Sequence, residues 1–335
     1  MSTPVRMGVV GAGSLGFHHV RILRDLPGVG FAGFVEGRPE RAAEVASELG
    51  VAAYADLDAL VEDVDAVTIV VPTPAHFEVA KKALEHGKHV FIEKPITATL
   101  DEADELLAIA ASNGAIVQTG HVERFNRAVR AALPHVSRPR FIESERLAPF
   151  NPRGSDVAVV LDLMIHDIDL ILTLVKGDTT ESITAVGVPV LTPMLDIANA
   201  RVTFTSGAVA NITSSRISRE RVRKIRIFQH SGYISLDLAA GTGEFFRLRQ
   251  RMDTSNPPSA PVDITDFVDR IPLIAPEGEP LRLEFESFVA AIRGEGPVIV
   301  TGEEGRRALS VALKIVAEIE RTAPAFAGEL AAARV

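Results

Sequence analysis

Two carboxylates and an imidazole recur at helical spacing in the segment LDLMIHDID, residues 161–169. At about 100° per residue, Asp162, His166 and Asp169 fall at i, i+4 and i+7 and share one stripe of a helix. The surrounding run, residues 157–175, is otherwise almost wholly apolar, and charges packed against a core need partners or shifted pKa values. The stripe predicts a cleft that needs a proton donor, a proton acceptor or a metal. The alternative is that these side chains are satisfied core, capping or solvent-facing residues.

Three glycines follow the first predicted strand, in the segment GAGSLG. Gly11, Gly13 and Gly16 fit the G-x-G-x-x-G pattern, in which glycine permits a tight turn, the approach of a pyrophosphate and close helix packing. The helix that begins there offers N–H donors to phosphates. Glu36 ends the second predicted strand, where an acid can accept the ribose hydroxyls. This combination predicts a dinucleotide site.

Glu36 also affects the choice between NAD and NADP. The carboxylate of Glu36 should repel a 2′-phosphate, which favours NAD over NADP. Arg38 lies two residues later, and its guanidinium could hold such a phosphate. NADP therefore stays as the less favoured alternative.

Two further polar groups follow predicted strands. VVPTPAH, residues 70–76, and EKP, residues 93–95, both lie where a doubly wound sheet binds its ligands. The prolines of the first segment could merely stop a strand and start a helix, but this does not explain His76. Lys94 would point at the nicotinamide edge of a cofactor, and partial desolvation would tune it toward acid/base work. A lone lysine in a loop is otherwise simply solvated.

The elements that must position these groups form two domains. In residues 1–122, short β-branched runs alternate with helical patterns, which predicts a doubly wound parallel sheet covered on both faces, an α/β Rossmann domain. The predicted strands are 5–10, 29–35, 51–54, 66–71, 89–92 and 115–119, and the predicted helices are 18–26, 38–49, 57–61, 75–85 and 100–112.

Residues 123–335 follow a different pattern. A strand at 140–147 precedes a turn-rich loop and the helix around His166, and alternating apolar and polar runs over 182–249 predict an antiparallel sheet with turns at two Ser-Gly pairs. We predict an irregular loop over 253–280. Two terminal helices, 284–293 and 303–322, and a frayed end complete this substrate-binding and oligomerisation domain.

Composition narrows the classes of function. The chain has 335 residues, 47% of them hydrophobic, and a net charge of -9, which argues against nucleic acid as the main partner. The basic run from residue 216 to 226 is predicted to be a solvated strand face. The absence of cysteine excludes disulfides, thiolate metal sites and a cysteine nucleophile. We expect a cytoplasmic protein, because the N-terminus lacks a secretory signal pattern and no apolar run reaches the ~20 uncharged residues of a membrane span.

Taken together, GAGSLG, the acid at position 36, PTPAH, EKP and the later D-x-x-x-H resemble the Gfo/Idh/MocA oxidoreductase family over nearly the full chain. The resemblance implies an N-terminal Rossmann domain that holds a nicotinamide cofactor. It also implies a C-terminal α/β domain whose large, open, mainly antiparallel sheet supplies the substrate pocket and often an oligomer interface, hence a homodimer or homotetramer. The family's catalytic Lys, Asp and His match Lys94, Asp162 and His166. A cis Lys94–Pro95 bond is also implied.

A narrower likeness is carried by GHVERFN (120–126), RLAPFNPRG (146–154), LDLMIHDID and DIANARVTF (196–204). These segments are similar to UDP-N-acetylglucosamine 3-dehydrogenases, which make the 3-keto sugar nucleotide that an aminotransferase converts to a 2,3-diamino sugar for lipid A. Arg127 stands where a proline is expected, a departure that concerns the start of a helix rather than the chemistry.

The resemblance implies NAD-dependent oxidation of the sugar 3-hydroxyl. His166 is the candidate base, oriented by Asp162, while Lys94 polarises the developing carbonyl or is itself the base. Asp169 is expected to support the site or the helix packing. The expected cofactor-binding residues are Gly11, Gly13, Ser14, Leu15, Gly16, Glu36, Arg38, Pro72, Thr73, Pro74, His76, Glu93 and Lys94. The expected substrate-binding residues are Lys94, Arg124, Asn126, Arg153 and His166.

The guanidinium forks of Arg124 and Arg153 suit a diphosphate, although each could be a surface or interdomain residue. Three alternatives stay open. They are a related dehydrogenase acting on another sugar nucleotide, an aldose or a polyol; a non-catalytic family member that senses NAD and a sugar; and a metal enzyme using Asp162, His166 and Asp169.

Overall fold

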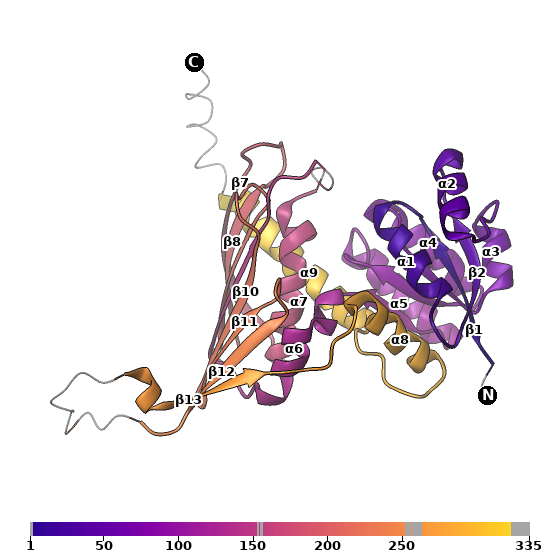
Figure 1. Cartoon of the computed structure of the whole chain (residues 1–335). Coiled ribbons are helices and arrows are strands. Elements are labelled where there is room, and N and C mark those ends of the chain that lie inside the picture. Colours follow the sequence, from indigo (N-terminus) through magenta and orange to yellow (C-terminus); the bar gives the residue numbers. More distant parts are fainter. Residues whose placement is uncertain (1–2, 153, 155–156, 252–254, 256–262, 323–335) are drawn as a thin grey trace, which may run out of the picture. The chain divides into compact units, whose positions relative to one another are not determined.

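The computed structural model describes residues 3–152, 154, 157–251, 255 and 263–322 (Figure 1). The chain folds into two compact units. The first contains residues 1–122 and 278–310, and the second contains 123–277 and 311–335. Among the described residues, no helix has the length and apolar character needed to cross a membrane.

The first unit is built on sheet A, which has five parallel strands in the order β2-β1-β3-β4-β5. The strands are β1 (Val5–Val10), β2 (Val29–Val35), β3 (Ala66–Ile69), β4 (His89–Glu93) and β5 (Val117–Gly120). The helices between them are α1 (Ser14–Arg24), α2 (Pro39–Leu49), α3 (Leu57–Asp63), η1 (Thr73–Ala75), α4 (His76–Glu85) and α5 (Leu100–Asn113). The predicted doubly wound parallel sheet is confirmed.

One predicted strand of this unit is wrong. Residues 51–54 form only a single bridge, between Ala53 and Phe34 of β2. The segment is confined between Gly50, which ends α2, and Asp56, which caps α3.

The strand order explains why the polar motifs gather at one edge of sheet A. From β1 the chain moves outward to β2 and then crosses back to β3, so the direction of winding reverses between β1 and β3. Ligands of open α/β sheets bind outside the carboxyl ends of the strands at such a point. The glycine-rich loop follows β1, the PTPAH segment follows β3, and Lys94 follows β4.

Helix α8 (Pro280–Ile292) also belongs to the first unit. Phe285 and Phe288 are fully buried, and their ring centroids lie 5.1 and 5.9 Å from that of Phe91 on β4. Apolar burial against the parallel sheet therefore brings the chain back after residue 277. A single boundary at residue 122 does not describe this return.

The second unit is built on sheet B, with strand order β13-β12-β11-β10-β6-β9-β8-β7. Its neighbouring strands are antiparallel except for the parallel pair β6–β9, so the expected large, mainly antiparallel sheet is confirmed. The strands are β6 (Phe141–Leu147), β7 (Thr180–Val188), β8 (Ile197–Phe204), β9 (Val209–Ser215), β10 (Val222–Gln229), β11 (Gly232–Asp237), β12 (Thr242–Leu248) and β13 (Val268–Leu273).

Strand β13 lies within residues 253–280, which we predicted to be an irregular loop, so that prediction is wrong for this part. The strand pairs with β12 at the edge of sheet B. Pro272 makes the strand hard to recognise in the sequence. Proline has no N–H to donate to a ladder and is therefore tolerated in a sheet mainly on an edge strand. Residues 253, 254 and 256–262 of that predicted loop lie outside the described ones.

Helices cover one face of sheet B (Figure 1). The helical segments of this unit are η2 (Val122–Phe125), α6 (Arg127–Ala132), η3 (Leu133–His135), the π-helical turn η4 (Val160–Met164), α7 (Ile165–Leu174), η5 (Ile264–Asp266) and the later part of α9 (Gly302–Thr322). Along β6, Ile142, Ser144 and Arg146 are buried, whereas Glu143 and Glu145 alternate with them on the opposite face. This period of two determines which side chains can reach α7.

Candidate active site

The glycine-rich loop is tightly packed at Gly11 and Gly16 but has space beside Gly13. A Cβ at Gly11, where φ is +92°, would lie 2.6 Å from the carbonyl oxygen of Val70, and one at Gly16 would lie 1.9 Å from that of Gly11. At Gly13, which precedes α1, the nearest atom to such a Cβ is Nη2 of Arg38 at 3.7 Å. The loop therefore has room outside the N-terminus of α1, where a pyrophosphate fits.

Glu36 faces this loop as an ionised carboxylate. Its side chain is only 8% exposed. Its oxygens accept hydrogen bonds from the backbone N–H of Ala12 at 3.0 Å and from Nε of Arg38 at 2.9 Å. The hydrogen bond from Arg38 is the main reason that the pKa of Glu36 lies below its usual value. Glu36, the acid expected to accept the ribose hydroxyls, thus lies next to the loop. It is paired with Arg38, the residue that could hold the 2′-phosphate of NADP.

Arg41, which the motif did not indicate, also holds the loop. Its Nε donates to the carbonyl oxygen of Ala12 at 3.0 Å and its Nη2 to that of Gly13 at 3.4 Å. The sequence offered no signal beyond a basic residue near the start of the helix after Glu36. The guanidinium fixes the orientation of two loop peptides.

His76 connects the loops that follow β3 and β4. Its imidazole is buried, with Nδ1 2.8 Å from the carbonyl oxygen of Pro95 and Nε2 2.9 Å from that of Val71. Burial lowers the pKa of His76. Both ring nitrogens are therefore engaged within the protein, and the ring braces the Lys94 loop. The Lys94–Pro95 peptide bond is cis, as the resemblance implied.

A buried contact between a glutamate and a histidine lies directly before Lys94. Oε1 of Glu93 is 3.1 Å from Nε2 of His19 on α1, and Nδ1 of His19 is 3.3 Å from Oγ1 of Thr68 on β3. The backbone N–H of Lys94 donates to the other oxygen of Glu93 at 3.3 Å. Burial opposes ionisation of Glu93, but His19 and Lys94 outweigh it and hold its pKa below the usual value. His19 thus links α1, the helix that follows the glycine-rich loop, to the residue before the half-buried Lys94.

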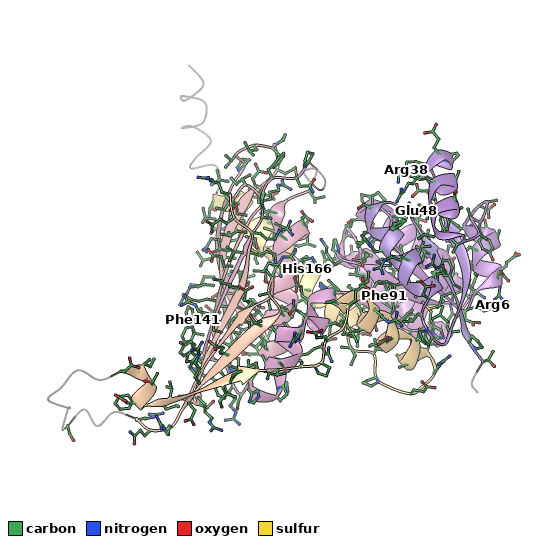
Figure 2. The ribbon with its side chains drawn as sticks, viewed as in Figure 1. Arg6, Arg38, Glu48, Phe91, Phe141 and His166 are labelled. Carbon is green, nitrogen blue, oxygen red and sulfur yellow. The ribbon has the colours of Figure 1, made fainter. Side chains whose placement is uncertain are left out.

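Asp162, His166 and Asp169, which we expected to share one helical stripe, have different environments in the second unit. Asp162 lies in the π-helical turn η4, His166 lies in the first turn of α7 (labelled in Figure 2), and both are half-buried. A Cβ at Gly154 would approach a carboxylate oxygen of Asp162 to 3.1 Å. Asp169 is instead 1% exposed. Single π-helical turns often occur at functional sites.

Asp169 forms a buried two-point ion pair with Arg124. Nε and Nη2 of Arg124 lie 2.8 and 2.6 Å from its carboxylate oxygens. The fork that we expected to hold a diphosphate is therefore bonded to the protein's own carboxylate. Among the described residues, no three His, Asp or Glu side chains are grouped to hold a metal ion.

Asn126 is also engaged inside this unit. Its Oδ1 accepts the N–H of Ala128 at 3.0 Å and so caps α6, while its Nδ2 donates to Glu123 at 3.1 Å and to the carbonyl oxygen of Leu238 at 2.9 Å. These contacts favour a structural role. Arg127 occupies the first position of α6, at the start of a helix as expected. Arg153 lies outside the described residues.

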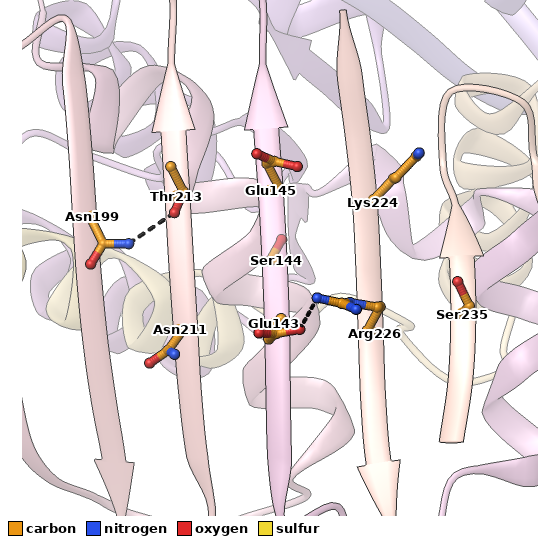
Figure 3. Close-up of a pocket in the computed structure, with 9 residues that line it drawn as sticks. All are labelled: Glu143, Ser144, Glu145, Asn199, Asn211, Thr213, Lys224, Arg226 and Ser235. Carbon is orange, nitrogen blue, oxygen red and sulfur yellow. Dashed lines mark hydrogen bonds and ion pairs between the residues drawn. The ribbon is translucent and has the colours of Figure 1, made fainter. Parts of the chain in front are cut away.

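A polar hollow of about 540 Å³ lies on the uncovered face of sheet B (Figure 3). Glu143 of β6 and Arg226 of β10 form an ion pair there, beside Asn211 and Lys224. Because side chains alternate along β6, these groups face away from α7. The hollow is separate from Asp162 and His166.

Comparison with known proteins decides the family. Residues 5–121 match the model described as "Oxidoreductase family, NAD-binding Rossmann fold", and residues 127–235 match the GFO/IDH/MocA C-terminal domain. The chain belongs to the Gfo/Idh/MocA oxidoreductase family. The first unit of this Gfo/Idh/MocA protein is accordingly an NAD(P)-binding Rossmann domain.

Individual relatives of this Gfo/Idh/MocA protein cover most of its length. It is 38% identical to a UDP-N-acetylglucosamine 3-dehydrogenase from Acidithiobacillus ferrooxidans, over 94% of this chain and 97% of the relative. A solved structure of that enzyme superposes with a TM-score of 0.86 at 37% identity, covering 96% of this chain and 99% of the other. Identity to scyllo-inositol 2-dehydrogenase (NAD(+)) from Bacillus subtilis is 30%, over 65% of this chain and 69% of the relative.

Proposed function

We propose that this protein oxidises the 3-hydroxyl of UDP-N-acetylglucosamine to the 3-keto sugar nucleotide, with NAD as the oxidant. The observation that carries the proposal is the near full-length likeness to the Acidithiobacillus enzyme, at 38% identity and a TM-score of 0.86. The B. subtilis inositol dehydrogenase, at 30% identity, keeps a polyol as the second candidate substrate.

The proposed catalytic residues are Lys94 of the first unit and Asp162 and His166 of the second. His166 removes the proton of the 3-hydroxyl, Asp162 orients His166, and Lys94 polarises the carbonyl oxygen that develops. The half-burial of all three side chains supports these roles, because each is held by the protein and still partly accessible to a substrate. Lys94 is the alternative base. A dinucleotide held by the glycine-rich loop and Glu36 would supply the acceptor for the hydride that leaves C3.

NAD is the proposed cofactor, with NADP as the alternative. The ionised carboxylate of Glu36 can accept the ribose hydroxyls and repel a 2′-phosphate, while Arg38 is already paired with it. The buried contacts of His76 and Glu93 lead us to propose that these two position the loop around Lys94. The proposed cofactor contacts are Gly11, Gly13, Ser14, Leu15, Gly16, Glu36, Arg38, Pro72, Thr73, Pro74 and Lys94.

Absorbance at 340 nm tests the proposal. The protein is mixed with NAD and UDP-N-acetylglucosamine, with the partner aminotransferase and glutamate present to pull the equilibrium. We expect NADH formation that is lost in Lys94→Met and His166→Ala variants that still bind NAD. A signal with a free aldose or polyol but not with the sugar nucleotide would indicate a different dehydrogenase. NAD binding without turnover of any sugar would indicate a sensor.

We further propose a homodimer or homotetramer that uses the uncovered face of sheet B. A ladder of stacked rings crosses four strands there, with Phe228 and Tyr233 at its centre and 5.6 Å between their centroids. The polar hollow of Figure 3 lies on the same face. A monomer on light scattering would reject this assembly. Coupling to an aminotransferase and a cytoplasmic location stay predictions.

A further inference from the structure

Two arginines face each other across the covered side of sheet B. Arg223 of β10 is the register partner of Arg146 of β6. Further along β10, Ile225 and Ile227 are buried on the same side, whereas Arg226 alternates onto the uncovered face. Like charges placed directly opposite on neighbouring strands repel. This pair therefore needs compensating negative charge.

Arg146 forms most of the ion-pair contacts that offset the positive charge of these two arginines. Its Nε and Nη2 lie 2.6 and 3.1 Å from the carboxylate oxygens of Asp167, and its Nη1 lies 2.9 Å from Oε1 of Glu123. Nη1 of Arg223 reaches that same oxygen of Glu123 at 3.3 Å. Arg223 thus shares one carboxylate oxygen with a closer competitor, and its side chain is 40% exposed.

Partial burial and neighbouring positive charges both oppose the charge of Arg223. Its pKa lies below the usual value because it is partly buried and because Arg146 and Arg221 repel its charge, which Glu123 and Asp167 offset only in part. Arg216, in contrast, is buried with Nε 2.8 Å from Asp196. The run 216–226 is therefore not the uniformly solvated strand face that we predicted.

Arg223 is connected by ion pairs to the residue that follows the proposed base. Arg223, Glu123, Arg146 and Asp167 are linked by successive ion pairs, and Asp167 directly follows His166 on α7. Within the described part of the chain, the guanidinium of Arg223 makes one hydrogen bond, to Glu123. Such a fork of N–H donors matches the geometry of a phosphate. Arg124, from which we expected that role, is instead bonded to Asp169.

We infer that Arg223 binds the diphosphate of the sugar-nucleotide substrate in the second unit. The inference rests on the proposed function, which supplies a substrate with that group. Through this contact, Arg223 distinguishes a nucleotide-linked sugar from a free sugar. Glu123 then holds Arg223 in position without neutralising it.

Binding of UDP alone, followed by calorimetry on the full-length protein, tests the inference. Arg223→Gln should weaken the affinity for UDP by about 10- to 100-fold, the loss expected for a charge-assisted hydrogen bond of ~1.5–3 kcal/mol. Arg226→Gln is the matched control, because it removes a guanidinium from the opposite face of the same strand. It should bind UDP as the wild type does. The affinity for NAD should stay the same in both variants.

Turnover separates substrate recognition from chemistry. In Arg223→Gln the KM for UDP-N-acetylglucosamine should rise far more than kcat changes. If this variant does not fold, Arg223→Lys decides the question, since it retains the charge but loses the planar fork. It should bind UDP at least threefold more weakly, as expected from the weaker match of an ammonium to a phosphate.

Unchanged affinity for UDP in a folded Arg223→Gln protein, or in Arg223→Lys if only that variant folds, would overturn the inference and leave the proposed function intact. An equal loss of affinity in Arg226→Gln would also overturn it, since the effect would then be one of overall charge. A wild-type protein that binds NAD but neither UDP nor UDP-N-acetylglucosamine would overturn the proposed function and the inference together.

Discussion

Arg146 holds the residue that follows the proposed base: its Nε lies 2.6 Å from Oδ2 of Asp167, and both side chains are almost completely buried. The ion pair joins β6 to α7 just beyond His166. Two residues further along α7, Asp169 is held in the same way by Arg124 of η2. Two buried arginines, one from β6 and one from η2, therefore hold α7 directly after His166, which is itself half-buried.

Replacing Arg146 by methionine should destabilise the protein strongly. The substitution leaves Asp167 buried without its guanidinium, and breaking a buried pair in this way costs about 3–5 kcal/mol. The free energy of unfolding from urea titration measures the loss. Arg270→Met is the control, because Arg270 pairs with Glu244 and is 65% exposed, and exposed pairs contribute about 0–1 kcal/mol. Equal losses of unfolding free energy in the two variants would show that burial does not determine how much each ion pair contributes to stability.

Glu36 should control the choice between NAD and NADP. Glu36→Ser removes the repulsion of a 2′-phosphate and releases Arg38 from its ion pair. The ratio of kcat/KM for NADP to that for NAD should rise by about tenfold or more, equivalent to ~1.4 kcal/mol. Glu40→Ser removes an exposed acid from the first turn of α2 and should leave the ratio as it is. A ratio that falls in Glu36→Ser would show that the assignment is wrong.

Asp196 should make stability depend on pH in the acid range. Burial opposes its ionisation, but the backbone N–H of Thr192 and of Val190, together with Arg216, outweigh burial and hold its pKa well below the usual range. A carboxylate with a depressed folded-state pKa stabilises the fold above its unfolded pKa of about 3.9, and this contribution disappears as pH falls through the folded-state value.

Asp196→Asn should therefore lose about 3–5 kcal/mol near pH 7, because Arg216 stays buried without its partner. The difference from the wild type should shrink as the pH falls below about 4. Unfolding curves at several pH values measure both quantities. A difference that stays constant down to the lowest pH at which the wild type folds would contradict a role for the ionised carboxylate.

His76 should act on turnover more than on cofactor affinity. His76→Ala removes the imidazole that lies between the carbonyl oxygens of Val71 and Pro95, in the loops after β3 and β4, so kcat should fall by about 10- to 100-fold through misplacement of Lys94. His86→Ala, at an exposed position beyond the end of α4, is the control. A large loss of NAD affinity with unchanged kcat would show that His76 is a cofactor ligand instead.

The sequence predicted the parallel sheet of the first unit well because each of its signals is local. Buried β-branched runs, the spacing of the glycines and the acid at position 36 all lie within a few dozen residues. The catalytic candidates came from the same kind of signal, since Asp162 and His166 are four residues apart. Their functional roles stay predictions.

The other features depend on contacts between distant residues. Glu93 meets His19 across 74 positions and Asp169 meets Arg124 across 45, and no spacing rule points to either pair. Asp169 and Asp162 look equivalent on a helical stripe, yet only the fold shows that one meets an arginine. Pro272 hides an edge strand for a similar reason, because edge and centre cannot be told apart before the sheet is assembled.

The central claim is that hydride leaves C3 of the sugar, and isotopic labelling tests it most directly. UDP-N-acetylglucosamine carrying deuterium at C3 is incubated with the protein, NAD, the aminotransferase and glutamate, and the reduced cofactor is analysed by mass spectrometry. We predict one deuterium in each molecule of NADH and a slower reaction than with unlabelled substrate. Reduced cofactor without deuterium, or deuterium retained in the sugar product, would contradict the proposed reaction.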